Sequence, residues 1–274
     1  MTRPLCRTCG TQYPDSPAPP AACPICQDER QFVPESGQAW TTLDDLRRDH
    51  RTVISPVEPG LDQILVEPDF AIGERAFLIR LPPDAVLGGG VVMWDCVALI
   101  DAATVAAIQA LGGLRAIVIS HPHFYTTMVE WADAFGCPVY LHADDRAWVQ
   151  RTGPALSFWS GETLALGDGL TVIRCGGHFA GAAVLHWAAG AGGRGALFTG
   201  DTIQGVLDRR WVSFMYSYPN LIPLPARAVR RIADAVSPFA FDRLYGGFAG
   251  RQVAEDARGV VLRSADRYMR AIAG

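Results

Sequence analysis

Ala116-Ile117-Val118-Ile119-Ser120-His121-Pro122-His123 is the stretch of sequence that decides the fold. Its first four residues are all apolar, which predicts a β-strand buried on both faces. A His-x-His pair follows this strand almost directly, so two imidazoles are expected just beyond the strand's carboxyl end. A single histidine is more often structural than ligating, but a pair in this position indicates a metal site.

Two other predicted strands end in the same way. Residues 170–174 lead into Gly176-Gly177-His178, and residues 196–199 lead into Gly200-Asp201. Sites in α/β proteins form outside the carboxyl ends of strands, and glycine lets backbones approach one another closely. We therefore expect one metal site, whose ligands are His121, His123, His178 and Asp201.

The His-x-His, Gly-Gly-His and Thr-Gly-Asp-Thr motifs together resemble those of the metallo-β-lactamase superfamily. The resemblance covers most of the chain from Asp62 to the C-terminus. It implies an α/β fold, the αββα sandwich, with the metal at one rim of the two sheets. Family members usually carry His-x-His-x-Asp-His, in which the first two histidines hold one metal and the last two residues hold a second.

This chain departs from the family pattern where the second metal would be held. Tyr125 and Thr126 stand at the Asp and last His positions, and Phe248 stands where the family's final histidine would align. The resemblance implies that the first-site histidines survive together with Asp201, which bridges the two metals in the family. We therefore expect one metal ion in this domain.

The expected site suits a catalytic zinc with an open or water-filled position, because three neutral imidazoles and a carboxylate can activate water near neutral pH. This predicts a mononuclear zinc hydrolase acting on an ester, lactone, thioester or similar bond of a small molecule, anionic molecules included. Asp201 would be a ligand or the base, or it would cap the chain or hold a ligand histidine. Without a second cation an oxyanion needs other donors, for which Tyr125 and Thr126 are candidates.

Two other functions fit the same residues. Two histidines and a carboxylate also suit non-heme Fe(II), which would make the chain an oxidoreductase on the same fold. Alternatively, the site is non-catalytic and binds metal for structure alone.

A second metal site is predicted at the N-terminus. Cys6, Cys9, Cys23 and Cys26 form two Cys-x2-Cys pairs separated by residues 10–22, the spacing of a rubredoxin-like zinc ribbon. Gly10 suits the left-handed turn after such a pair. Disulfides and a redox dithiol are less consistent with a cytosolic chain and two paired knuckles. A closed four-thiolate shell predicts a structural zinc and a possible protein-docking module. Residues 1–38 would form this ribbon and its polar linker, and residues 39–274 the metallo-β-lactamase-like domain.

Apolar runs and helical patterns alternate after the ribbon. Helices are expected at 42–50, 103–111, 128–135, 226–236 and 253–273, and strands at 61–67, 75–81, 91–94, 97–100, 116–119, 139–141, 170–174, 184–188 and 196–199. This alternation predicts a layered domain with helices on both sheet faces.

Composition excludes several classes of function. Apolar residues make up 49% and charged residues 19% of the 274-residue chain, as in folded globular proteins. The net charge is −4 and no dense basic stretch occurs, so nucleic-acid binding is not expected. All 24 basic residues are arginine, which excludes Schiff-base and P-loop lysine chemistry. No segment resembles a signal peptide or a membrane span, and we predict a cytoplasmic protein.

Several other polar residues carry weaker expectations. Thr127 and Glu130 fit a capping box at a helix start. His142, near Asp144 and Asp145, would be structural or would support the site or its substrate. Tyr216, Tyr218 and Asn220 lie in a loop where the family often places substrate-facing residues, although aromatics there could equally be packing. His50 and His186 are given no role. The remaining cysteines are expected to be buried thiols, namely Cys96, Cys137 and Cys175.

Overall fold

The structure is a computed structural model that describes residues 1–273. Its larger sheet has seven strands in chain order, of which β3 to β6 pair antiparallel and β6 to β9 pair parallel. The strands are β3 (Arg51–Glu58), β4 (Leu61–Glu67), β5 (Ala76–Leu81), β6 (Gly90–Trp94), β7 (Leu114–Val118), β8 (Val139–His142) and β9 (Leu156–Trp159).

The second sheet has six strands, and only the β13–β18 pair is parallel. They are β10 (Thr163–Gly167), β11 (Leu170–Arg174), β12 (Ala183–Trp187), β13 (Ala196–Phe198), β18 (Arg243–Tyr245) and β19 (Gln252–Val253). Short pairs lie outside the two sheets: β1 (Leu5–Cys6) with β2 (Trp40–Thr41), β14 (Gln204–Gly205) with β15 (Val212–Ser213), and β16 (Met215–Ser217) with β17 (Ile222–Pro223).

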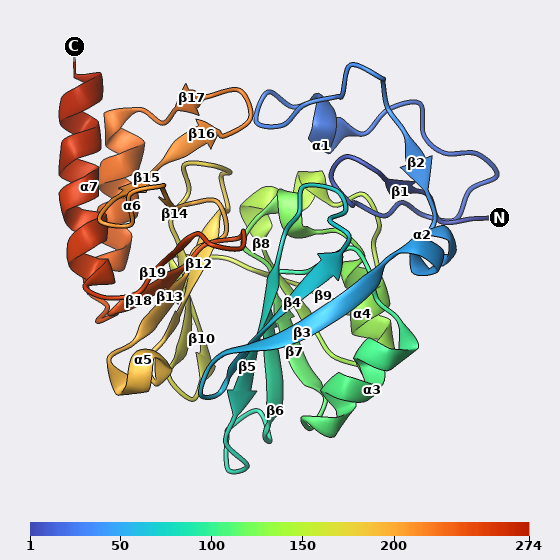
Figure 1. The fold of residues 1–274 in the computed structure, drawn as a ribbon, viewed down its shortest axis with the longest axis horizontal. Helices are drawn as coiled ribbons and strands as arrows, with labels where there is room; N and C mark the ends of the chain where they lie inside the picture. The colour runs from blue at the N-terminus through green and yellow to red at the C-terminus, as the bar shows by residue number, and fades with distance from the viewer. Residues whose placement is uncertain (274) are drawn as a thin grey trace.

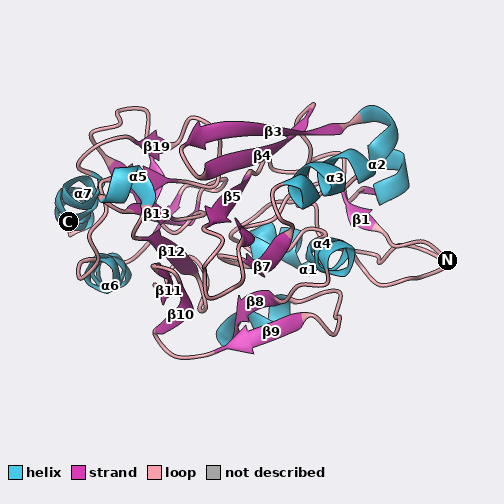
Figure 2. Ribbon diagram, turned by 90° about the horizontal axis from the view of Figure 1, so that it is seen from below, coloured by secondary structure: helices cyan, strands magenta, loops and turns pink. Residues whose placement is uncertain are grey.

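Helices cover the outer face of each sheet, which gives the predicted αββα sandwich (Figures 1 and 2). On the seven-stranded side lie α2 (Leu43–Asp49), α3 (Ala102–Ala110) and α4 (Met128–Phe135), and on the six-stranded side lie α6 (Ala226–Val236) and α7 (Ala257–Ile272). The short helices α1 (Pro24–Gln27) and α5 (Gly190–Gly193) and the 3₁₀ turns Pro122–Phe124 and Ala143–Trp148 complete the fold.

The alternation of side chains along a strand explains why the central strands are apolar at every position. In β13, Ala196 and Phe198 point into the core between the sheets, whereas Leu197 points to the core under α6 and α7. In the same way, Val118 of β7 faces the other sheet and Ile117 faces α4. Each buried strand therefore holds two hydrophobic layers together.

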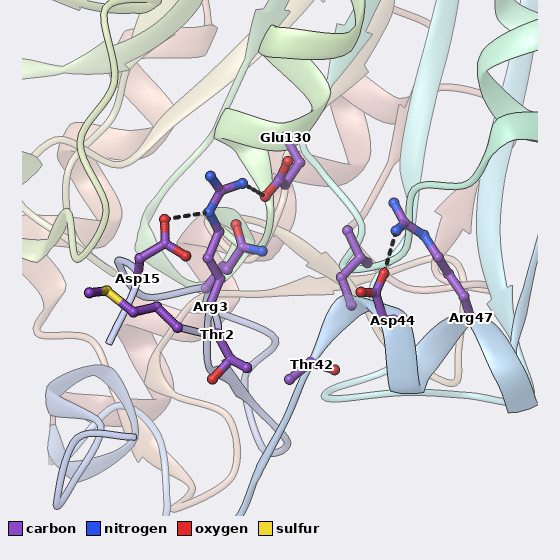
Figure 3. A pocket seen from close by; sticks show the side chains of 10 residues that line it. Thr2, Arg3, Asp15, Thr42, Asp44, Arg47 and Glu130 are labelled. Carbon is purple, nitrogen blue, oxygen red and sulfur yellow. Dashed lines mark hydrogen bonds and ion pairs between the residues drawn. The ribbon is translucent and has the colours of Figure 1, made fainter. Parts of the chain in front are cut away.

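The four-cysteine ribbon packs on one end of the sandwich (Figure 1). The backbone N–H of Gln12 donates to the carbonyl of Thr126 at 3.0 Å. Figure 3 shows the groove between the ribbon and helices α2 and α4, where the Arg3 guanidinium donates to Asp15 at 3.2 Å and to Glu130 at 2.8 Å. The charged side chains drawn there are paired with one another.

The predicted domain boundary at residue 38 stays a prediction. Strand β1 lies before the boundary and strand β2 after it, and the two form one small sheet in which Cys6 pairs with Trp40. The first residues of the second predicted domain are therefore hydrogen-bonded to the ribbon.

The prediction of a strand at residues 97–100 is wrong. This segment is a buried loop whose backbone groups are bound by side chains instead of a neighbouring strand. Trp131 Nε1 donates to the Val97 carbonyl at 3.0 Å, the Thr127 hydroxyl donates to the Ala98 carbonyl at 3.0 Å, and the Ala98 N–H donates to Glu74 at 3.3 Å. An apolar run predicts burial, but it does not say which groups satisfy the backbone.

Two predictions about helix starts are also wrong. The Thr127 hydroxyl is used by the buried loop and does not cap α4, while Glu130 pairs with Arg3 and Arg151, so no capping box forms. The last helix begins at Ala257 and not at Val253, because residues 252–253 form strand β19 against β18. By contrast, Thr42 caps α2 as expected, since its side chain accepts from the Asp45 N–H.

None of the helices among residues 1–273 combines the length and the apolar character needed to cross a bilayer.

We expect Trp131→Phe to lower the free energy of unfolding by about 1–2 kcal/mol, because it removes the hydrogen bond to the Val97 carbonyl and part of a buried side chain. Trp211→Phe is the matched control, since Trp211 is only partly buried and a phenyl ring keeps the contact with Arg267. Its change should stay within about 0.5 kcal/mol. Urea unfolding midpoints measure both, and equal losses in the two variants would contradict this account of the loop.

Candidate metal centre

Three strand ends bring the predicted ligands to one rim of the sandwich. Strand β7 ends at Val118, and a 3₁₀ turn over Pro122–Phe124 places His121 and His123 on either side of Pro122. Strand β11 leads through Gly176 and Gly177, both with positive φ, to His178. Strand β13 leads through Gly200, where an added Cβ would lie 2.5 Å from the Ser120 hydroxyl, to Asp201. Glycine is therefore required for the approach of these strand ends.

The four ligating side chains face one another and are buried. The Oδ2 atom of Asp201 lies 3.5 Å from His121 Nε2, 3.8 Å from His123 Nδ1 and 4.0 Å from His178 Nε2. The His123 Nδ1 and His178 Nε2 atoms are 3.3 Å apart. The prediction that these residues lie together is confirmed.

Neighbouring groups fix the orientation of two of the rings. The Met215 carbonyl accepts from His178 Nδ1 at 3.2 Å, which leaves the Nε2 lone pair facing the centre. The Nδ1 atom of His121 is 2.9 Å from the Ser120 hydroxyl, and the Ser120 N–H donates to buried Asp95 at 2.7 Å. Such outer partners hold ligand imidazoles in one tautomer and direction.

Burial and mutual charge set the ionisation of the group. Burial lowers the pKa of His121 to about 4 and lowers the pKa of His178 well below its ordinary value. Burial alone would raise the pKa of the Asp201 carboxyl, but the adjacent His121 and His123 lower that pKa far below its usual range. Neutral imidazoles beside an ionised carboxylate are the forms that bind a cation.

The donor set fits a tetrahedral ion. Zinc bonds of about 2.0–2.1 Å place neighbouring ligand atoms about 3.3 Å apart, close to the separations found here. Among residues 1–273, His121 Nε2 and Asp201 Oδ1 are buried without a hydrogen-bond partner, a costly arrangement unless another group binds them.

The four cysteines form the second group of this kind in the described chain. All are buried free thiols, with Cys6 Sγ 3.6 Å from Cys26 Sγ and Cys9 Sγ 3.6 Å from Cys23 Sγ. These separations are far longer than a disulfide bond and close to the roughly 3.8 Å expected for thiolates on one zinc. Gly10 has the predicted positive φ, at 73°, and Gln38 Nε2 donates to Cys6 Sγ at 3.2 Å.

The three residues that stand at the family's second-site positions supply no ligand to the centre. The Tyr125 hydroxyl donates to the Asp145 carbonyl at 3.4 Å, and Thr126 packs beside Gly10 of the ribbon. Phe248 stands where the resemblance would place a histidine, and together with Asp201 it lines a cavity beside the centre. Tyr125 and Thr126 do not line that cavity, so their predicted catalytic role stays a prediction without support from the geometry.

A cavity of about 350 Å³ opens beside the histidine centre. Its walls come from the centre itself, the ribbon and three loops: Arg30, Gln31, Phe32, Ala71, Ile72, His123, His178, Asp201, Tyr218, Pro219 and Phe248. Arg30, Gln31 and Phe32 belong to the ribbon's end and its linker in the sequence prediction, which does not include them in the site. They lie roughly 150 positions from His178 in the chain, and no local pattern signals such a contact.

Strand β16 and the turn that joins it to β17 hold the ribbon in place. Asn220 Nδ2 donates to the carbonyls of Glu29 and Gln31, both at 2.9 Å, and the Tyr216 hydroxyl donates to the Glu29 carboxylate at 2.8 Å. Tyr218 lines the cavity, with its hydroxyl donating to the Ser213 carbonyl at 3.2 Å. Tyr216 and Asn220 are therefore packing residues that position the ribbon, whereas Tyr218 faces the site, where a substrate would bind.

His142 belongs to the structural alternative. Its Nδ1 accepts from the Asp144 N–H at 3.2 Å, its Nε2 is 3.2 Å from the Gly161 carbonyl, and its ring packs against Trp159. The three remaining cysteines are buried, as expected.

Comparison with known proteins places these features in context. No family model matches the sequence. The uncharacterized protein YmaE of Bacillus subtilis (strain 168) is 49% identical over 270 residues, which are 98% of this chain and 96% of that protein.

Solved structures with a similar fold include several metallo-β-lactamases. VMB-1 aligns with a TM-score of 0.60 and 15% identity over 81% of this chain and 99% of its own. DIM-1 metallo-β-lactamase aligns with a TM-score of 0.60 and 16% identity over 81% of this chain and 98% of its own. The mono-zinc form of FIM-1 from Pseudomonas aeruginosa aligns with a TM-score of 0.56 and 14% identity over 80% of this chain and 96% of its own. These likenesses confirm the predicted metallo-β-lactamase fold.

We expect metal analysis of the purified protein to find two ions per chain, one in each group of ligands. The double variant Cys9→Ala/Cys26→Ala should retain only the ion of the histidine centre, and His121→Ala/His178→Ala should retain only the ion of the ribbon. His50→Ala removes a histidine outside both groups and should change nothing. A third ion, or the loss of both ions in either double variant, would contradict two independent sites.

Proposed function

Because the chain belongs to the same family as YmaE of Bacillus subtilis and has the metallo-β-lactamase fold, we propose that it is a mononuclear zinc hydrolase. Its substrate would be an ester, lactone, thioester or similar bond of a small molecule. The observation that carries this proposal is the buried group of three histidines and Asp201, which opens onto a cavity large enough for such a molecule.

The proposal of one metal ion in this domain rests on the residues around the centre. Tyr125, Thr126 and Phe248 occupy the positions that would hold a second ion, and their side chains offer no imidazole or carboxylate. Among residues 1–273, the four-residue group is the one cluster of possible ligands at this rim. FIM-1 has been crystallised in a mono-zinc form, so the fold accommodates a single ion in that protein.

Three histidines favour zinc over iron at this centre. Catalytic zinc is commonly held by three protein ligands with an open position, whereas non-heme iron sites use two histidines and one carboxylate. A zinc ion held there would polarise the substrate carbonyl and make water a good nucleophile at neutral pH. His121, His123 and His178 would hold the ion, and Asp201 Oδ2 lies within 4.0 Å of a nitrogen of each histidine.

Asp201 Oδ1 would act as the base. It is buried and has no partner among residues 1–273. Although its pKa is low, a bound ion would also lower the pKa of water, so this carboxylate could take the proton that water loses as its oxygen attacks the carbonyl carbon. The carbon–oxygen or carbon–sulfur bond to the leaving group then breaks, and the same proton passes to the leaving atom. The products are a carboxylic acid and an alcohol or thiol, so the reaction needs no further reactant besides water.

We expect the zinc-loaded protein to hydrolyse 4-nitrophenyl butyrate, and Asp201→Asn to lower kcat by about 10²–10⁴-fold because the amide cannot accept the proton. His121→Ala/His178→Ala should abolish the activity, and His50→Ala should retain it. Release of 4-nitrophenol measures the rate.

Three outcomes would overturn this proposal. Iron in place of zinc after anaerobic purification would favour the oxidoreductase alternative. Hydrolysis that persists in the double histidine variant would place the activity elsewhere. A protein that binds zinc at the centre but cleaves no ester, lactone or thioester would favour the non-catalytic alternative.

A further inference from the structure

We propose that the zinc ribbon supplies the substrate-binding wall of the histidine centre, with Gln31 as the residue that orients the substrate. The substrate class is an uncharged, largely apolar carbonyl compound. This inference rests on the proposed hydrolase function and adds to it the residue and the chemistry that select the substrate.

The ribbon is fixed against the site from three sides. The Arg30 guanidinium donates to the carbonyl of the ligand His178 at 3.2 Å and stacks on Phe179, with its central carbon 3.9 Å from the ring centroid. The Ser217 hydroxyl donates to the Arg30 carbonyl at 3.1 Å, and Asn220 binds the Gln31 carbonyl. These contacts therefore hold the segment from Arg30 to Phe32 in place as a wall of the cavity.

Arg30 does not provide a free positive charge for an anionic substrate. Its Nε and Nη2 atoms donate to the two carboxylate oxygens of Asp28 at 2.5 and 2.8 Å, a bidentate pair that neutralises the guanidinium. Its remaining strong contact is the His178 carbonyl. With the substrate carbonyl at the metal centre, a negative charge at the far end of the substrate would meet no unpaired cation among the residues of the ribbon wall.

Gln31 is different, because its amide group has no hydrogen-bond partner among residues 1–273. The residue is only 4% exposed, its backbone N–H and carbonyl are both hydrogen-bonded, and Oε1 has no partner among residues 1–273. Its Nε2 makes no hydrogen bond within the described chain and is not one of the fully buried atoms, so it is a donor open to a ligand. The buried Oε1 acceptor costs free energy unless a donor reaches it.

The rest of the wall is apolar. Phe32, Ile72 and Phe248 present hydrocarbon to the cavity, and the Tyr218 hydroxyl is occupied by the Ser213 carbonyl. A volume of about 350 Å³ lies at the small end of ligand pockets. Among the uncharged side chains outside the metal centre that line this cavity, Gln31 is thus the one with an unused donor, which can hydrogen-bond a small apolar molecule and hold its carbonyl group in one direction.

The first test compares two esters on the zinc-loaded, full-length protein. 4-Nitrophenyl butyrate and 4-nitrophenyl hemisuccinate share a leaving group and have acyl chains of the same length, but the second carries a terminal carboxylate. We expect kcat/KM to be at least about tenfold higher for the butyrate, because the wall that the acyl terminus reaches has no unpaired cation for the buried carboxylate. Equal values, or a preference for the hemisuccinate, would overturn the inferred substrate class.

The second test replaces the amide. Gln31→Met keeps the length of the side chain and removes its hydrogen bonds, and Gln27→Met makes the same change on the exposed face of the ribbon. We expect Gln31→Met to raise KM for the butyrate roughly three- to tenfold, and kcat to change less. Gln31→Glu, whose carboxylate cannot donate to a carbonyl, should show a loss of the same size or larger. Gln27→Met should match the natural protein.

Binding of 4-fluorobutyranilide, an amide analogue of the ester, gives a readout that does not depend on turnover. Its dissociation constant, followed by the ¹⁹F resonance, should rise roughly three- to tenfold in Gln31→Met and stay constant in Gln27→Met. Metal content and melting temperature should be equal in the two variants, which separates lost binding from a damaged ribbon. Equal affinities in the two variants would refute the role of Gln31.

The two proposals fail in different ways. If neither ester is cleaved, or cleavage persists in His121→Ala/His178→Ala, the hydrolase function is wrong, and anilide binding still reports on Gln31. If ester cleavage requires the histidines but Gln31→Met behaves as Gln27→Met, the inference about the ribbon wall alone is wrong.

Discussion

The burial of three imidazoles and a carboxylate around one point is the constraint on which the rest of the structure depends. Asp201 Oδ2 lies within 4.0 Å of a nitrogen of each histidine, and every one of these side chains is nearly inaccessible to solvent. Such a group is unfavourable in a low-dielectric interior unless an ion or a set of donors compensates it. The glycines before His178 and Asp201, and the hydrogen bonds from Ser120 and to Met215, serve to hold this arrangement.

The ribbon and the histidine centre are physically connected. Arg30 is anchored to Asp28 within the ribbon, contacts the carbonyl of His178 and stacks on the next residue, Phe179. The cysteine cluster sets the course of the chain up to Cys26, and the loop containing Ser217 and Asn220 holds the residues that follow. The four-cysteine ribbon, whose closed ligand shell leaves no open metal position, therefore shapes the cavity beside the histidine centre.

Packing residues stand at the positions where the motif resemblance to metallo-β-lactamases would place ligands of a second ion. Tyr125 is buried under the Ala143–Trp148 turn, Thr126 meets the ribbon, and Phe248 closes the cavity wall near Phe124. The places where a second ion would find ligands thus hold side chains that exclude water or support the ribbon. Thr126, which offers no imidazole, contacts the ribbon through its carbonyl.

The sequence by itself determined the sandwich, the four cysteines and the four ligands of the histidine centre. These features follow from local patterns: apolar strands that end in His-x-His, Gly-Gly-His and Gly-Asp, and cysteines at fixed spacing. The loop at residues 97–100 escaped prediction because apolar character signals burial and not the partner of each backbone group. Only the tertiary structure decided that Arg30, Gln31 and Phe32 line the cavity, since their contacts with His178 and Asn220 join residues far apart in the chain. A short sequence pattern reports what a segment does with its neighbours along the chain, whereas the wall of a cavity is made by segments that meet only after folding.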